Sequence, residues 1–139
     1  LADFLIDERE SNVFEYIDSL LEKSPHSLHI LHSLLLDGVY ELSILALLVR
    51  NIENLLFYHK ATAEGKTPSE IMNALGIKEK QQQKFINHAN HFTRTPLEKI
   101  FTLIHEAEEK IKGGWQYKSL LSNPLVELTE KIISIDKNL

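Results

Sequence analysis

The chain has 139 residues, which suits a single domain, and its 43% hydrophobic and 25% charged residues exclude a wholly disordered protein. It contains no cysteine, which excludes disulfides, thiolate metal sites and thiol catalysis. The net charge of -5 has the wrong sign for a protein that mainly coats nucleic-acid phosphates.

The chain begins Leu1-Ala2-Asp3 without an initiator Met, so we expect a fragment or a processed form of a longer protein. Its acidic first ten residues do not resemble a signal peptide. The most apolar long window, 39–57, contains too many polar groups for a membrane span. We therefore expect a soluble protein of the cytoplasm.

Hydrophobic residues recur at helical spacing in the first third of the chain. Over 12–23 they fall at i, i+3, i+4, i+7 and i+8, which predicts an amphipathic helix capped by Asn12. Ser24-Pro25 ends this helix. A second helix is predicted over 26–37, with Asp37-Gly38 as its stop signal.

The third predicted helix, over about 40–62, contains an unusually apolar segment. Six consecutive residues, 44–49, are all apolar. A helix that is apolar nearly all round is normally central and surrounded by others. Part of this surface can instead face a partner protein, an interpretation that we regard as the weaker of the two.

Capping sequences predict the remaining helices. Thr67-Pro68-Ser69-Glu70 and Thr95-Pro96-Leu97-Glu98 each place a hydroxyl cap before Pro, with Glu three residues after the cap. The predicted ranges of the last four helices are 68–75, 78–91, 96–112 and from Asn123-Pro124 onward. The expected fold class is all-α, a compact bundle of about seven helices with short connections.

Histidines are the only unusual polar residues. His26, His29 and His32 are spaced i, i+3 and i+6, which is a possible zinc or nickel site, but the first and last drift apart by about 120° around the helix. A polar helix face is the better interpretation of these three, and of the pair His88 and His91. Because the sequence also lacks a phosphate-binding Gly-rich loop and a nucleophile elbow, we expect no catalytic residue, metal or cofactor.

Residues 68–91 predict a helix, a Gly-containing turn and a second helix, an arrangement typical of helix-turn-helix DNA-binding proteins. Lys78, Lys80 and Lys84 on the second helix would then contact phosphates. A plain helical hairpin is the simpler interpretation, because the domain as a whole is acidic. A DNA-binding regulator is retained as the alternative function.

The order of motifs resembles a known family. The stretches that carry the resemblance are 13–20, the apolar run 44–49 with Arg50, Pro68-Ser69-Glu70-Ile71 through Leu75-Gly76-Ile77, and 107–114. Together they resemble the C-terminal helical domain of the delta subunit of bacterial DNA polymerase III over residues 12–133. Glu108 stands where that family usually has Asp.

The resemblance implies a structural role in the clamp loader, the five-subunit ring that places the sliding clamp on primed DNA. Residues 12–139 would form the collar domain, which packs beside delta prime and gamma/tau, and 1–11 would link it to N-terminal domains. This domain would be no enzyme, and it would reach the clamp and DNA only through the complete protein. The candidate subunit-interface residues are Arg50, Lys112, Trp115 and Tyr117. Trp115 and Tyr117 are aromatic residues in a predicted connection, and an equally good interpretation of Trp115 is that it covers the end of the bundle.

Overall fold

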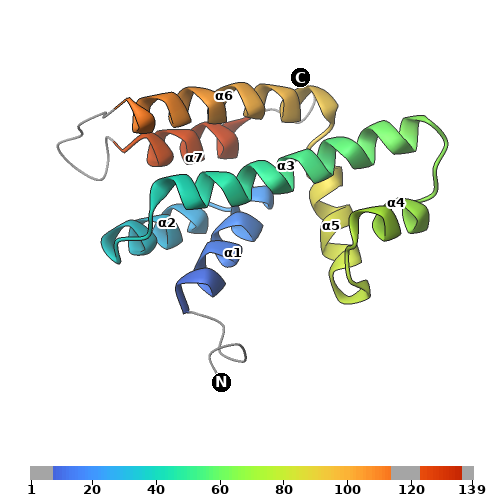
Figure 1. Ribbon diagram of the computed structural model, residues 1–139, viewed down its shortest axis with the longest axis horizontal. Coiled ribbons are helices and arrows are strands. Elements are labelled where there is room, and N and C mark those ends of the chain that lie inside the picture. Colours follow the sequence, from blue (N-terminus) through green and yellow to red (C-terminus); the bar gives the residue numbers. More distant parts are fainter. Residues whose placement is uncertain (1–7, 114–122, 136–139) are drawn as a thin grey trace.

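The computed structural model describes residues 8–113 and 123–135. Within these two ranges it contains seven α-helices and no strand, which confirms the predicted all-α fold (Figure 1). The helices are α1 Glu8–Leu21, α2 His26–Leu36, α3 Glu41–Ala63, α4 Pro68–Leu75, α5 Glu79–His91, α6 Arg94–Lys112 and α7 Pro124–Ser134. None of the described helices is both long and apolar enough to cross a membrane.

Helix α3, with 23 residues, runs through the centre of the molecule. Helices α1 and α2 lie beneath its N-terminal half, and α4 and α5 lie at its C-terminal end (Figure 1). Helices α6 and α7 lie side by side along its other flank, where α6 packs against α3 and α7 reaches both α1 and α2.

The apolar segment of α3 supplies much of the core. Ile44, Leu45 and Leu48 are at most 1% exposed, and Ile52 and Leu55 continue the same buried stripe. Leu47 and Val49 are only half-buried, and Ala46 is exposed. The prediction that α3 is central is therefore confirmed, but the helix also keeps an apolar side that its own core does not cover.

Two of the predicted helix starts are confirmed by their capping contacts. The Thr67 hydroxyl accepts a hydrogen bond from the Glu70 backbone N–H at 3.2 Å, so the first capping sequence starts α4. The Asn123 side chain accepts one from the Leu125 N–H at 2.8 Å, which starts α7. Gly76 ends α4 at φ 70°, a left-handed conformation that glycine adopts without steric cost.

Two other starts were wrong. Helix α1 begins at Glu8, so Asn12 lies inside it, and residues 8–11, expected in the linker, are helical. Helix α6 begins at Arg94, so Thr95 is not its cap. Proline is tolerated throughout a first turn, because the N–H groups there have no partner within the helix, so Pro96 does not fix the start.

Two contacts tie the ends of the bundle together. The Tyr16 hydroxyl of α1 lies 2.7 Å from Thr129 Oγ1 of α7, and both side chains are fully buried. The Lys23 ammonium donates a hydrogen bond to the Ile135 carbonyl at 2.7 Å and lies 4.9 Å from the centre of the Phe92 ring. Lys23 makes these contacts from a left-handed backbone conformation, with φ 59°, at the end of α1.

Candidate subunit interface

An open groove of about 910 Å³ lies between α1, the α2–α3 turn and the first half of α3. We call it the α1–α3 groove. It is lined mainly by apolar and small residues. These residues are Val13, Phe14, Gly38, Val39, Tyr40, Ser43, Ala46, Leu47 and Arg50.

The sequence builds the groove from residues adjacent to the core stripes. On α3, Ser43, Ala46, Leu47 and Arg50 follow the spacing i, i+3, i+4 and i+7, which places them on one side of the helix. Ser43 and Ala46 have short side chains, which creates a hollow on this side of α3. The larger side chains of Ile44, Leu45 and Leu48 are buried in the core instead.

Two aromatic side chains stand exposed at this groove. Phe14 of α1 is 53% exposed and Tyr40, immediately before α3, is 60% exposed. Large exposed aromatic residues beside a hollow are typical of protein–protein contact surfaces. Neither residue was predicted from the sequence, although the position of Phe14 outside the stripe formed by Val13, Tyr16 and Ile17 indicates an exposed aromatic residue.

Arg50, one of the predicted interface residues, lines this groove. Among the described residues that line it, Arg50 is the only charged one. Its side chain is exposed and forms no ion pair within the described parts of the chain. An unpaired guanidinium at an apolar groove can bind a carboxylate from another molecule.

Among the other predicted interface residues, Lys112 does not line this groove. Lys112 lies in the last turn of α6, and its ammonium is 3.2 Å from a carboxylate oxygen of Glu108. Trp115 and Tyr117 lie outside the described residues. The prediction for Lys112 as an interface residue stays untested, and its visible role is an ion pair along its own helix.

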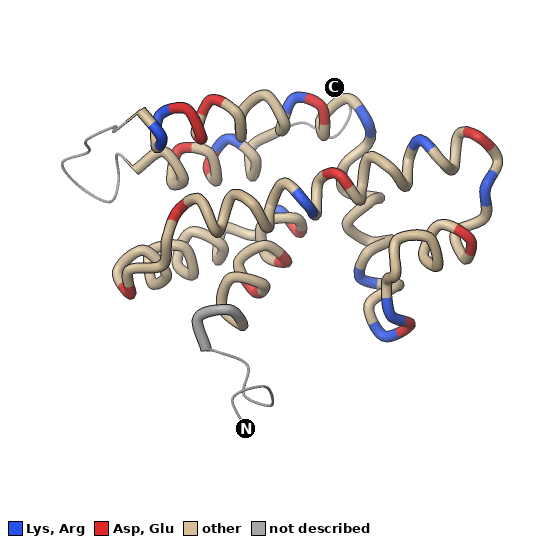
Figure 2. Tube along the Cα trace, in the orientation of Figure 1, with Lys and Arg blue, Asp and Glu red and all other residues tan. Residues whose placement is uncertain are grey.

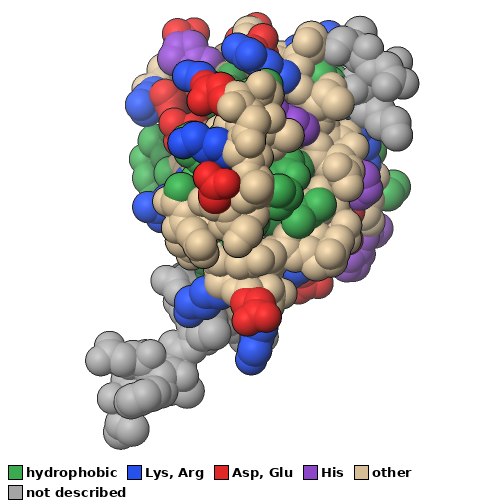
Figure 3. Space-filling view, turned by 90° about the vertical axis from the view of Figure 1, so that its right-hand side faces the viewer, with side chains coloured by type: hydrophobic (Ala, Val, Ile, Leu, Met, Phe, Trp, Pro, Cys, Tyr) green, Lys and Arg blue, Asp and Glu red, His purple; other side chains and the backbone are tan. Residues whose placement is uncertain are grey.

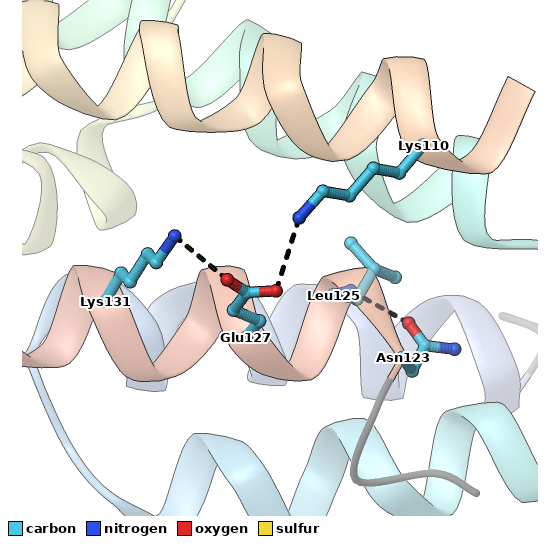
Figure 4. Close-up of polar contacts among 5 residues, drawn as sticks. All are labelled: Lys110, Asn123, Leu125, Glu127 and Lys131. Atoms are coloured by element: carbon cyan, nitrogen blue, oxygen red, sulfur yellow. Dashed lines mark hydrogen bonds and ion pairs between the residues drawn. The ribbon is translucent and has the colours of Figure 1, made fainter. Parts of the chain in front are cut away.

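The contact between α6 and α7 is polar at its edge. Glu127 of α7 lies 3.0 Å from the Lys131 ammonium and 3.5 Å from that of Lys110 on α6 (Figure 4). The hydrogen bond with Lys131 lowers the pKa of Glu127. Burial opposes this change, and the nearby charges of Lys110 and Lys131 add to the lowering. These pairs support the bundle and are half-exposed, so each contributes little stability.

Helices α4 and α5 follow one another across the turn at Gly76 and both pack against α3, and their cations do not form a DNA-binding surface of the usual kind. Lys84 lies 3.0 Å from the Asp18 carboxylate of α1. At this end of the molecule Lys and Arg side chains are interspersed with Asp and Glu (Figure 3). A protein that reads DNA normally gathers its cations on one face, so the hairpin is better explained as part of the bundle.

His59 has a clear structural role, whereas His88 is buried, so the prediction that it belongs to a polar helix face was wrong. His59 donates a hydrogen bond from Nε2 to the carbonyls of Ala89 and Phe92, at 3.0 and 2.7 Å, and so joins α3 to the end of α5. Burial lowers the pKa of His88, although Asp18 and Glu22 act in the opposite direction. Across the described ranges, no group of three His, Cys, Asp or Glu residues is placed to hold a metal ion.

Comparison with known proteins identifies the family to which this domain belongs. The family model for the DNA polymerase III delta subunit, C-terminal domain, matches residues 10–128. The chain belongs to this family. No curated protein shows significant sequence similarity to the chain.

A solved structure shares the fold of this delta C-terminal domain. The Bacillus subtilis DNA clamp loader delta protein (YqeN) superposes with a TM-score of 0.71 at 18% sequence identity. The match covers 96% of this chain and 39% of the Bacillus protein, so the chain spans well under half the length of that protein. The family resemblance and the all-α fold predicted from the sequence are both confirmed.

Proposed function

We propose that this domain is the collar of a clamp-loader delta subunit and that it packs beside delta prime and gamma/tau in the cytoplasm. The family match over residues 10–128 carries this proposal. The fold supports it, because the described bundle has a rigid apolar core and leaves large aromatic side chains exposed. The domain would hold delta in the loader, while ATP turnover takes place in neighbouring subunits.

In this proposal the domain makes and breaks no covalent bonds. Its contribution to placing the sliding clamp on primed DNA is the position in which it holds the rest of delta. We therefore expect the chain alone to bind neither nucleotide nor primed DNA and to load no clamps.

The test is association with the corresponding domains of delta prime and gamma/tau from the same organism. Size-exclusion chromatography and calorimetry at about 50 μM of each protein would detect binding in the micromolar range. A complex that contains this domain is the expected result. The absence of any complex, or tight duplex-DNA binding with a steep salt dependence, would contradict the proposal.

A further inference from the structure

We propose that the α1–α3 groove receives one amphipathic helix from a neighbouring clamp-loader subunit, and that a carboxylate on that helix pairs with Arg50. This inference rests on the proposed function, since it names the surface by which the collar domain would dock. Four features of the groove support it: its exposed aromatic residues, its shape, a described lining in which Arg50 is the only charged residue, and the lack of an ion pair for Arg50 within the described ranges.

The exposure of the aromatic residues separates them from the domain's own core. Tyr16, two residues after Phe14, is fully buried, whereas Phe14 remains 53% exposed. Tyr40 precedes the buried residues Ile44 and Leu45 but is itself 60% exposed. Aromatic side chains contribute most binding free energy when a partner removes both faces of the ring from water. For this reason they dominate the energetics of many interfaces.

The shape of the groove suits a helix. Its α3 side runs from Tyr40 to Arg50, which is about 15 Å along the helix axis, or nearly three turns. Gly38, Ser43 and Ala46 have small side chains, so backbones and apolar side chains of a partner can approach closely there. Helices bind such grooves through residues at i, i+3, i+4 and i+7, the same spacing that lines this one.

The charge around the groove selects the chemistry of the partner. Helix α3 has no Asp, Glu, Lys or Arg between Glu41 and Arg50 (Figure 2), and Arg50 is the only charged residue in the described lining. Glu15, Asp37 and Glu41 stand beside lining residues in the sequence. Nucleic acid is disfavoured as an occupant, because a single cation cannot neutralise a run of phosphates. An apolar helix with one Asp or Glu complements the groove, and the Arg50–carboxylate pair would set its register.

The experiment uses full-length delta with delta prime and gamma/tau of the same organism. The groove variants are Arg50→Glu and Tyr40→Ser, and the matched controls on the same helix are Lys60→Glu and Phe57→Ser. Lys60 and Phe57 are exposed, the latter by 41%, and neither lines the groove. Circular dichroism spectra and thermal midpoints would verify that all four variants fold.

We expect each groove variant to weaken assembly about tenfold or more, as for a central interface residue, and each control to change it less than about twofold. If the wild-type protein assembles and all four variants match it, the groove inference is overturned while the proposed function stands. If the wild-type protein fails to assemble, both are overturned.

A photo-reactive amino acid at position 40 identifies the occupant. The expected result is a cross-link to a helix of one neighbouring subunit, on a segment that also contains an acidic residue. The same probe at position 57 should give no such product. A cross-link to a second copy of delta, or none from position 40 in an intact assembly, would overturn the inference.

Discussion

The buried contact between Tyr16 and Thr129 offers a direct measure of how α7 is held on α1. Thr129 donates its hydroxyl proton to the Leu125 carbonyl at 2.7 Å. Because a threonine hydroxyl has one proton, Tyr16 must donate to Thr129 Oγ1 across the 2.7 Å between them. The two positions are 113 residues apart in sequence, so this bond joins the two ends of the described chain.

The two single substitutions should have unequal costs. Tyr16→Phe removes the donor but leaves the Thr129 proton bonded, so we expect it to lower the free energy of unfolding by about 1 kcal/mol. Thr129→Val leaves the buried Tyr16 hydroxyl without an acceptor, which costs roughly 1–3 kcal/mol. In the double variant both polar groups are gone, so its cost should be well below the sum of the two.

Urea unfolding followed by circular dichroism at pH 7 would measure all four proteins of this cycle. A coupling energy of about 1 kcal/mol is expected. Additive costs, within about 0.4 kcal/mol, would refute the assignment of the hydrogen bond.

An alkaline titration provides an independent check. Burial raises the pKa of Tyr16 to about 12. Since the unfolded chain releases this proton near pH 10, the free energy of unfolding should fall between pH 10 and 12, by up to about 3 kcal/mol. Tyr16→Phe should lack this component of the decline.

Three further features can be tested by single substitutions and urea unfolding. Burial lowers the pKa of His88, so the unfolded chain binds the proton more readily and stability should fall as the pH drops below 6.5. His88→Gln should flatten that slope, and an unchanged slope would contradict the burial of this imidazole. Lys23→Ala should be less stable than Lys23→Gly by about 1 kcal/mol, because only glycine relieves the left-handed backbone, and equal stabilities would contradict this. Glu127→Gln should lower the free energy of unfolding by less than about 1 kcal/mol. This difference should disappear in about 1 M salt and also below the depressed pKa of Glu127, where the carboxylate is already protonated. A difference unchanged by salt would contradict the pairing of Glu127 with Lys131.

Helices and their order could be predicted because their signals are local. The spacing of apolar residues and the Thr67 and Asn123 caps act within one or two turns, and the structure contains them. The start of α6 could not be predicted in the same way. Thr93 and Thr95 both precede Pro96, and the proline is compatible with either start because a first turn leaves its N–H groups unbonded.

The groove was harder to predict, because it depends on how helices distant in sequence come together. The run 44–49 indicated surplus apolar surface, but the sequence alone did not divide it between core and exterior. Which of these residues are buried depends on the packing of the other helices. Helix α6 packs against one side of α3, whereas Ala46 lies on a side that stays exposed. Arg50 was selected through family resemblance, whereas Phe14 and Tyr40 emerged only from the burial of their neighbours.

The length of α3 sets a fixed spacing within the domain. Its 23 residues form a rod about 35 Å long, with the groove along its first half and the α4–α5 hairpin at its far end. His59 fastens the end of α5 to this rod, so the hairpin is anchored to it rather than tethered by the connecting loop alone. Two molecules that contact opposite ends of α3 are therefore kept at a separation that is set by the length of this helix.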